Sequence, residues 1–333
     1  MPEKHRNYRY SRNPILPGQG VCDPHVRVFN NRFYLYATHD ASPENERFVM
    51  RDWWIWSSND LVDWKHECTL NPRDTWLGDG FGRCWATDAI ERDGSYYWYI
   101  SEGADSTTVL KAETPVGPWT DVLKGPLLQR ADLGGAAAHD PSLLIDDDGR
   151  AYMIVGYKQY YLLELNDDMV SLSGPARRVE VINPTSPLGA GTLDDKPTLH
   201  KRAGIYYLSW GCFYAVSDCI EGPYECKGSF LQEENIDPAL RPATGRVKGF
   251  TPAQTFGDQK WDATYDRHGS FFEYAGQWYF ICNDHASSGN AFFRDSVIAR
   301  VDYHDNGDIR PVHIDAMGVK AVQTPINAPL HTN

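Results

Sequence analysis

The amino-acid sequence predicts an all-β protein, a five-bladed β-propeller with an active site in its central funnel. Three observations favour this fold class: one hairpin pattern recurs five times, each copy is rich in aromatic residues, and long helical periodicity is absent. Regularly spaced hairpins in units of three or four strands are typical of propeller blades. A large β-sandwich is the alternative, which the regular recurrence disfavours.

The recurring hairpins each begin with a Gly- or Asn-type turn, which is a strong hairpin signal between extended segments. The five copies are "NNRFYLYAT" (30–38), "DGSYYWYIS" (93–101), "DGRAYMIVG" (148–156), "AGIYYLSWG" (203–211) and "AGQWYFICN" (275–283). A short extended run precedes each copy, and a third strand follows most of them. We therefore expect one domain over residues 1–333, with blades at approximately 21–70, 84–125, 139–182, 194–232 and 267–312.

The composition limits the classes of partner. The 333 residues include 32 Lys and Arg against 45 Asp and Glu, so the net charge is −13. Nucleic acid and anionic membranes are poor partners for such a chain, and we expect neither. The 19 Tyr and 11 Trp residues offer flat surfaces on which sugars can stack. The sequence leaves the oligomeric state open.

The cysteines and the N-terminal segment bear on the cellular compartment. Seven cysteines without a CxxC pair predict neither a disulfide framework nor a zinc knuckle. The first residues, "MPEKHRNYRYSR", contain no apolar segment of the signal-peptide type, and no apolar run approaches membrane length. As written, the chain is expected to be cytoplasmic, and a mature secreted form is the alternative.

One repeat position carries most of the polar chemistry. Counting back seven or eight residues from each hairpin turn gives Asp23, Trp85, Asp140, Asp195 and His268. The innermost strands of a propeller start at the same end of the channel, so these side chains should face one funnel. An Asp before Pro is also a common turn former, which is the alternative for each Asp taken alone. Three carboxylates on one repeat position favour a shared site.

Crowded carboxylates shift one another's pKa values apart, so that one serves as a base and another as an acid. Glycoside hydrolysis requires such a pair, and an aromatic wall would hold the sugar. The alternative is a metal site, because carboxylate oxygens and water suit Ca²⁺. His268 is the candidate ligand, acting through water. The two interpretations can coexist, with a structural Ca²⁺ in the channel and no cofactor required for the chemistry.

Over residues 13–309 the chain resembles glycoside hydrolase family 43, a family of five-bladed propeller enzymes. "NPILPGQGVCDPHVRVFNNRFYLYATHD" is similar to the family's first blade, which implies that Asp23 is the general base. "HDPSLLIDDDGRAYM" closely matches the segment whose Asp tunes the pKa of the acid, which implies that role for Asp140.

Three further segments carry the same resemblance. "CWATDAI" implies that Trp85 is a sugar-stacking wall. "RHGSFFEYAGQWYF" places His268 in the channel near an ion or water cluster, where it would also help to bind substrate. "FFRDSVIARVDYHDNGDI" resembles the closing strands and implies that Arg294 reaches the substrate.

The general acid departs from the family pattern. The family has a Glu in a Glu-Gly-Pro string, whereas "DDKPTLHKRAGIYYL" has Asp195 at that position. Asp is one methylene shorter, and proton transfer needs contacts near ~3 Å. We expect Asp195 to be the acid, with Asp194 or Glu102 as alternatives. Glu221 belongs to a literal Glu-Gly-Pro string, but the repeat places it in an outer turn, where it is expected to be solvated.

The resemblance implies an inverting, exo-acting glycoside hydrolase that releases arabinofuranose or xylose from plant cell-wall-type oligosaccharides, with a galactose-type sugar as a minority outcome. The loops 40–52 and 71–83 are expected to border the funnel. Trp76, His39 and Asp40 are further substrate-binding candidates, for which a packing anchor or a plain turn is the alternative. Rival functions are a carbohydrate-binding propeller that lacks its acid and a retaining fructosidase of related families.

Overall fold

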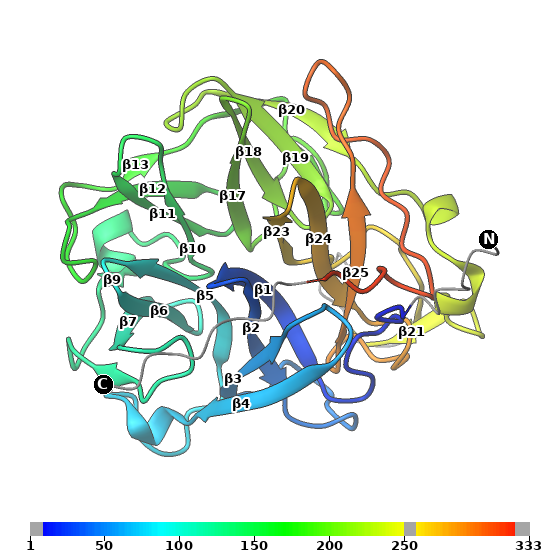
Figure 1. Cartoon of the computed structure of the whole chain (residues 1–333), viewed down its shortest axis with the longest axis horizontal. Helices are drawn as coiled ribbons and strands as arrows, with labels where there is room; N and C mark the ends of the chain where they lie inside the picture. The colour runs from blue at the N-terminus through cyan, green and yellow to red at the C-terminus, as the bar shows by residue number, and fades with distance from the viewer. Residues whose placement is uncertain (1–8, 250–257, 324–333) are drawn as a thin grey trace, which may run out of the picture.

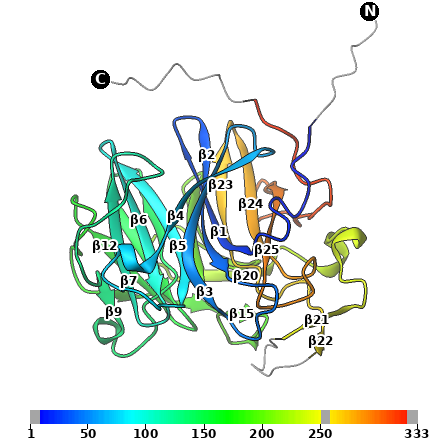
Figure 2. The ribbon, with the colours of Figure 1, turned by 90° about the horizontal axis from the view of Figure 1, so that it is seen from below.

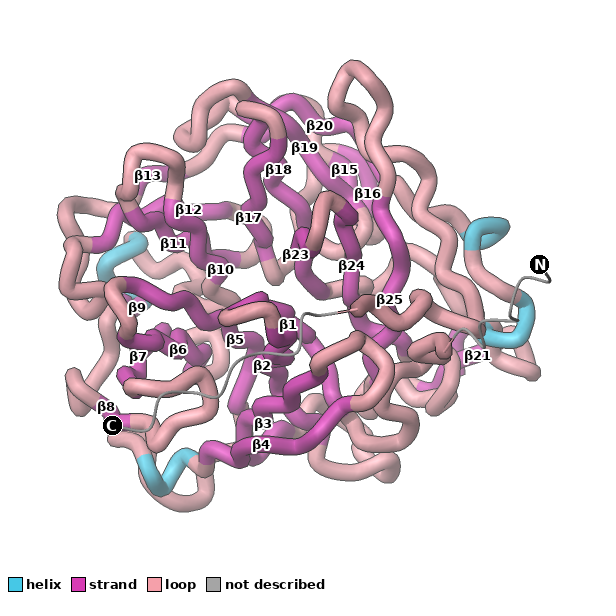
Figure 3. The backbone as a smooth tube through the Cα atoms, in the orientation of Figure 1, coloured by secondary structure: helices cyan, strands magenta, loops and turns pink. Residues whose placement is uncertain are grey.

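The computed structural model describes residues 9–249 and 258–323. Five β-sheets surround a common axis (Figure 1). Nearly all the regular structure is strand, and the described helices are single 3₁₀ turns (Figure 3). The predicted all-β, five-bladed fold is confirmed. The expectation about a leader segment falls largely on residues 1–8, which lie outside the described residues.

The blades follow one another along the chain, and their inner strands β1, β5, β10, β17 and β23 contact one another around the axis. Blade one contains β1 Val21–Phe29, β2 Arg32–Asp40, β3 Met50–Ser58 and β4 Trp64–Leu70. Blade two contains β5 Cys84–Arg92, β6 Ser95–Glu102, β7 Ser106–Ala112, β8 Thr120–Asp121 and β9 Leu128–Gln129. Blade three contains β10 Ser142–Ile145, β11 Ala151–Gly156, β12 Tyr160–Leu165 and β13 Arg177–Arg178.

The last two blades complete the ring. Blade four contains β17 Pro197–Arg202, β18 Ile205–Trp210, β19 Phe213–Ser217, β20 Tyr224–Ser229 and β14 Val181–Ile182, which pairs with β20 in parallel. Blade five contains β23 Gly269–Tyr274, β24 Gln277–Asp284 and β25 Asp295–Val301. Strand β1 contacts both β5 and β23, so the first and last blades meet.

Short elements connect the blades and lie partly over the end of the ring. Strands β15, β21 and β22 gather at one end of the molecule (Figure 2). These connections contain β15 Thr185–Ser186, β16 Gly189–Ala190, β21 Arg246–Lys248, β22 Asp258–Lys260, η1 Pro72–Asp74, η2 Arg130–Leu133, η3 Glu233–Asn235 and η4 Pro238–Leu240. No helix within the described ranges combines the length and apolar character needed to cross a membrane.

The hairpin turns explain how the local sequence sets the blades. Type I′ turns need positive φ at both central residues. Four predicted turns meet this condition: Asn30-Asn31, Asp93-Gly94, Ala203-Gly204 and Ala275-Gly276. The third blade differs, because the backbone N–H of Asp146 donates to the carbonyl of Arg150 over 2.9 Å. Its loop therefore has three residues rather than the predicted two.

This longer turn changes which blade positions are equivalent. Counted from the last backbone pair of each hairpin, Asp23 and Asp140 correspond to Lys196 rather than to Asp195. All three precede a proline and have positive φ values of 47°, 59° and 54°. The repeat count from the sequence was therefore one residue off in blade four, although Asp195 still lies at the entrance of its blade.

Apolar side chains packed between neighbouring sheets hold the inner strands in place. Trp53, Trp98 and Trp210 are fully buried, one in each of blades one, two and four. Truncating such a side chain to alanine typically costs about 3–5 kcal/mol of unfolding free energy. The aromatic residues that the sequence supplies in each hairpin thus form the core that fixes the strand entrances around the axis.

Candidate active site

A cavity of about 620 Å³ opens where the five inner strands begin. Its lining includes five carboxylates: Asp23, Asp140, Asp194, Asp195 and Asp266. Other polar side chains in the lining are Arg130, His139, Lys158, Gln159, His268 and Arg294. Apolar and aromatic residues complete the wall: Phe48, Met50, Trp85, Ala104, Ala136, Ala137, Tyr157, Leu188 and Tyr265. We refer to this cavity as the funnel.

Asp23 is held as a buried carboxylate at the floor of the funnel. Arg294 Nη1 and Asn283 Nδ2 donate to its Oδ1 over 3.0 and 2.8 Å. Its own backbone N–H donates to Asn283 Oδ1 over 2.6 Å. Burial alone would raise the pKa of Asp23, but Arg294 and His268 together hold that pKa below its usual value. Asp23 is therefore ionised at neutral pH, as a general base must be.

Arg294 is itself fixed by a second carboxylate. Its Nε lies 3.0 Å from Asp40 Oδ2, and its backbone N–H donates to the same oxygen over 2.8 Å. The guanidinium also stacks over the ring of Phe48 at 4.9 Å. Asp40 is fully buried and lies behind the funnel wall. Its place is that of an anchor for Arg294 rather than of a group that faces substrate.

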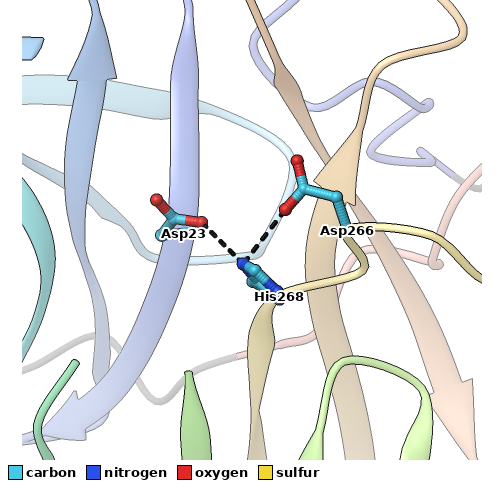
Figure 4. A group of neighbouring side chains, drawn as sticks. All are labelled: Asp23, Asp266 and His268. Atoms are coloured by element: carbon cyan, nitrogen blue, oxygen red, sulfur yellow. Dashed lines mark ion pairs between the residues drawn. The ribbon is translucent and has the colours of Figure 1, made fainter. Parts of the chain in front are cut away.

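His268 connects the carboxylates from the two sides of the funnel. Its Nδ1 lies 3.0 Å from Asp266 Oδ1 and 3.6 Å from Asp23 Oδ1 (Figure 4). Its Nε2 lies 2.7 Å from Asp195 Oδ1. Burial would lower the pKa of His268, but Asp195 and Asp266 raise it well above its usual value.

Asp140 lies in the opposite electrostatic environment from Asp23. Its side chain is buried, and burial followed by repulsion from Asp195 and Asp23 raises its pKa well above the usual value. The backbone N–H of Lys196 donates to Asp140 Oδ2 over 3.0 Å. The pKa values of Asp140 and Asp23 are thus shifted in opposite directions, so Asp140 holds a proton more readily than Asp23 does.

Asp195 is the most accessible of the three predicted catalytic carboxylates. Its side chain is 30% exposed, whereas that of Asp23 is 7% exposed. Asp194 lies deeper, and its Oδ1 accepts the backbone N–H of Asp195 over 3.1 Å. Asp195 is therefore better placed than Asp194 to reach a group that enters the funnel. Glu102, the other alternative acid, is not among the lining residues.

The remaining predicted site residues divide by position. Trp85 lines the funnel, edge-on to His139 at 5.4 Å between ring centroids. His39 instead points away, stacked on Trp54 at 3.6 Å and 2.7 Å from Asp52. Trp76 is exposed and lies outside the lining.

Of the two loops expected to border the funnel, only one lines the cavity. The 40–52 loop supplies Phe48 and Met50, whereas no residue of the described loop 71–83 belongs to the lining. Glu221 is exposed and pairs with Arg177 in the outer turn between β19 and β20, as expected.

Sequence reasoning missed Asp266, Lys196, His139, Arg130 and Lys158. Lys196 had a usable signal, because it precedes a proline as Asp23 does. His139 directly precedes Asp140 and Asp266 lies two residues before His268, so both had a signal in their predicted neighbours. Arg130 and Lys158 lie in loops without repeat character, so only the folded ring shows that they meet the others.

Three groups of side chains are close enough together to hold a metal ion: Asp23 with Asp266 and His268, His139 with Asp140 and Asp195, and Asp194 with Asp195 and His268. In the first group, the Oδ1 atoms of Asp23 and Asp266 lie 3.0 and 3.5 Å from Arg294 Nη1. A guanidinium beside both ligand oxygens opposes a divalent cation at that place.

Residues 11–309 match the family model described as Glycosyl hydrolases family 43. The chain belongs to glycoside hydrolase family 43. The predicted resemblance is therefore confirmed, and the protein is a glycoside hydrolase.

Two curated relatives show the range within the family. The "Beta-D-galactofuranosidase xynD" of Aspergillus niger is 29% identical, with 92% of this chain and 86% of the relative covered. A "Xylosidase/arabinosidase" of Bacteroides ovatus is 24% identical, with 89% and 95% covered.

Solved structures of the family share the fold. A family 43 enzyme from Xanthomonas citri complexed with xylose superposes with a TM-score of 0.70 at 22% identity, covering 92% of this chain and 94% of the other. A β-xylosidase/α-arabinofuranosidase from a compost metagenome, in complex with xylotriose and described as a calcium-free form, gives 0.71 at 24% identity, covering 92% and 98%.

Proposed function

We propose that this family 43 protein is an inverting, exo-acting glycosidase that releases a terminal arabinofuranose, xylose or galactofuranose unit from plant cell-wall-type oligosaccharides. One observation carries the proposal: Asp23 and Asp195 contact opposite nitrogens of His268 across the funnel floor. Asp23 Oδ1 lies 3.6 Å from Nδ1 and Asp195 Oδ1 lies 2.7 Å from Nε2, so the imidazole ring of His268 separates the two carboxylates. An inverting pair needs about 6.5–9.5 Å between its carboxyl groups to admit a water, and this arrangement supports such a gap.

In the proposed reaction, ionised Asp23 accepts a proton from a water below the anomeric carbon as the water oxygen bonds to that carbon. Asp195 gives a proton to the leaving oxygen as the glycosidic bond breaks. Asp140 has a carboxyl oxygen within 4.8 Å of an Asp195 oxygen and is the proposed modulator of the acid. Trp85 forms an apolar wall on which a sugar face can stack.

The exo proposal rests on the shape of the site. The cavity is a single funnel with apolar side chains such as Phe48, Met50 and Leu188 around its wall. A funnel of this kind admits the end of a chain more readily than its middle. The three sugars are those named for the relatives, and galactofuranose is included because it is named for the relative at 29% identity.

The residues of the channel bear on the expected Ca²⁺. Calcium requires about six to eight oxygen ligands. At Asp23 and Asp266 the channel instead presents the buried guanidinium of Arg294. The group of Asp23, Asp266 and His268 therefore does not fit a calcium ion, and no step of the proposed reaction involves one.

The experiment is a screen of nitrophenyl furanosides and xylosides with the wild-type protein and Asp23→Asn. We expect the wild-type protein to cleave a glycoside with inversion of the anomeric configuration. Proton NMR of the released sugar measures this. Asp23→Asn should lower kcat by about 10²- to 10⁴-fold. Retention of configuration, or an unchanged rate in Asp23→Asn, would contradict the mechanism.

A second candidate is a carbohydrate-binding propeller without hydrolytic activity. The observation that favours it is the 2.7 Å ion pair between Asp195 and His268, which opposes proton donation by that carboxyl. Sugar binding by calorimetry, with every glycoside left intact, would support this candidate.

A further inference from the structure

The funnel lining contains two cations that the proposed reaction does not use, Arg130 and Lys158. Arg294 differs from both, because it is buried and pairs with the floor carboxylate of Asp23. Lys158 is exposed, and its ammonium lies 4.9 Å from the ring centroid of Tyr157. No carboxylate of the described residues lies within ion-pair distance of that ammonium. Lys158 is therefore available to an anionic group that enters the funnel.

A tight turn at 157–159, between β11 and β12, holds Lys158 at the rim. Gly156 precedes the turn with a φ of +130°, and a Cβ there would lie 2.1 Å from a backbone oxygen of the turn. Only glycine permits so close an approach. The backbone nitrogen of Lys158 lies 3.5 Å from the carbonyl oxygen of Asp194, and the Tyr160 hydroxyl donates to the same oxygen over 2.8 Å. The turn is thus attached to the residue directly before the proposed acid.

Arg130 lies in the connection between blades two and three. Its Nε and Nη2 donate to the carbonyl of Gly135 over 3.2 and 2.8 Å, which fixes the guanidinium. Its Nη1 lies 3.8 Å from Asp105, and the same carboxylate pairs with Arg83 at 2.9 Å. One carboxylate therefore serves two guanidiniums. The side chain of Arg130 is 48% exposed, so its remaining charge faces the cavity that it lines.

Both cations belong to the side of the funnel that carries the proposed acid. The turn of Lys158 contacts the residue before Asp195, and the connection that contains Arg130 leads directly into Asp140. Carboxyl oxygens of Asp140 and Asp195 lie within 4.8 Å of each other. A general acid protonates the leaving oxygen, so groups beside it face the leaving part of the substrate.

The sign of the charge indicates what that part contains. The whole chain has a net charge of −13, yet the rim beside the acid presents two cations that its own carboxylates do not balance. Cations that line a cleft favour an anionic ligand. A planar carboxylate suits both a guanidinium fork and an ammonium, and a sugar that carries a carboxylate is a uronic acid.

We propose that Arg130 and Lys158 form a subsite for the leaving part of the substrate and bind the carboxylate of a uronic acid there. The preferred substrate is then an oligosaccharide whose released sugar is attached next to a uronic acid residue. Both side chains contact substrate without touching the reacting atoms, so they determine specificity. The inference rests on the proposed hydrolytic function and deepens it.

The test compares two oligosaccharides that differ in one charge. Both end in the sugar that the nitrophenyl screen identifies. The leaving part of one contains glucuronic acid, and in the other that carboxyl group is reduced to a primary alcohol. The measured quantity is the ratio of kcat/KM for the acidic oligosaccharide to kcat/KM for the reduced one. A change in stability or in the chemical step affects both substrates and cancels in this ratio.

The variants separate charge from position. Lys158→Gln and Arg130→Gln each remove one charge, the double variant removes both, and Lys158→Arg keeps the charge. Lys124→Gln is the matched control. Lys124 is also exposed and also has a positive φ, 51° against 60° for Lys158, but it lies outside the funnel lining.

The wild type should favour the acidic oligosaccharide, mainly through a lower KM. Each single substitution to Gln should lower the ratio by about 1.5- to 5-fold, as expected for one exposed ion pair, and the double variant should bring it to about one. Lys158→Arg and Lys124→Gln should retain the wild-type ratio. Salt at about 1 M, where the Debye length is about 3 Å, should reduce the wild-type preference.

A wild-type ratio of one, or an unchanged ratio in the double variant, would overturn the proposal. A wild type that cleaves no glycoside would instead refute the proposed function. Calorimetry with the same two oligosaccharides would then decide the inference, because the wild type should bind the acidic one more tightly and the double variant should not. Equal binding of both oligosaccharides by the wild type would overturn it.

Discussion

Arg294 Nη1 donates to Asp23 Oδ1 over 3.0 Å, although the two residues lie 271 positions apart in the sequence. The contact joins the residue just before β25, the last strand of blade five, to the first strand of blade one, where the ring closes. The same guanidinium is held from behind by Asp40. Closure of the propeller and ionisation of the proposed base therefore depend on one buried side chain.

Arg294→Met should destabilise the fold as well as abolish activity. The substitution leaves the carboxylates of Asp23 and Asp40 buried without their cation, and such losses cost about 3–5 kcal/mol. Urea denaturation measures the change. Arg300→Met is the control, because Arg300 lies in β25, which begins directly after Arg294, and its side chain is 60% exposed. Its substitution should change the unfolding free energy by less than about 0.5 kcal/mol. Similar stabilities for the two variants would contradict the role of Arg294.

Asp195→Asn and Asp194→Asn should separate the two candidate acids. Asp195→Asn removes the proposed proton donor, so it should lower the hydrolysis of natural oligosaccharides by about 10²- to 10⁴-fold. Nitrophenyl glycosides, whose leaving group needs little protonation, should lose much less. Asp194→Asn should affect both substrate types equally and mildly. If Asp194 were the acid, Asp194→Asn rather than Asp195→Asn would lose much more activity on natural oligosaccharides than on nitrophenyl glycosides.

Trp85→Ala should weaken substrate binding, whereas Trp76→Ala should not. Trp85 lines the funnel, and loss of a stacking wall typically costs about 0.5–1.5 kcal/mol beyond lost area, which is roughly up to tenfold in affinity. Trp76 lies on the surface outside the lining. Steady-state kinetics should show a raised KM for Trp85→Ala alone. An effect of Trp76→Ala on KM would restore the predicted role of the 71–83 loop.

His200 should make the fold less stable as the pH falls. It is buried between Tyr207 and Phe271, and burial together with Arg202 lowers its pKa to about 3. The unfolded chain takes up this proton near its usual pKa of about 6.5, whereas the folded chain does not until about pH 3. The unfolding free energy contributed by this site therefore falls by about 1.4 kcal/mol per pH unit between these values.

His200→Phe should reduce the slope of the unfolding free energy against pH by the contribution of up to one proton. Urea denaturation between pH 4 and 7 measures it, with the exposed His304→Phe as control. An unchanged slope in His200→Phe would show that His200 is charged in the folded state.

The strand entrances were predictable because their signals are local. Asp23 and Asp140 each precede a proline and lie seven or eight residues before a hairpin turn, and the structure places both in the funnel. Their equivalence to Lys196 was missed, because the third turn has one more residue than its Asp-Gly pair suggested. Which residues of neighbouring blades are equivalent depends on backbone pairing, and the amino-acid sequence does not show that pairing.

The sequence by itself determined the number of blades, the inner strands and the family, since hairpin turns and strand patterns depend on neighbouring residues. Only the tertiary structure decided that Arg294 and Asp266 meet Asp23, that Asp40 lies behind the wall, and that the ammonium of Lys196 is buried in the channel. The physical reason is that charge balance in a closed ring depends on which side chains share a low-dielectric space. That sharing is set by the packing of five sheets around one axis rather than by any one segment.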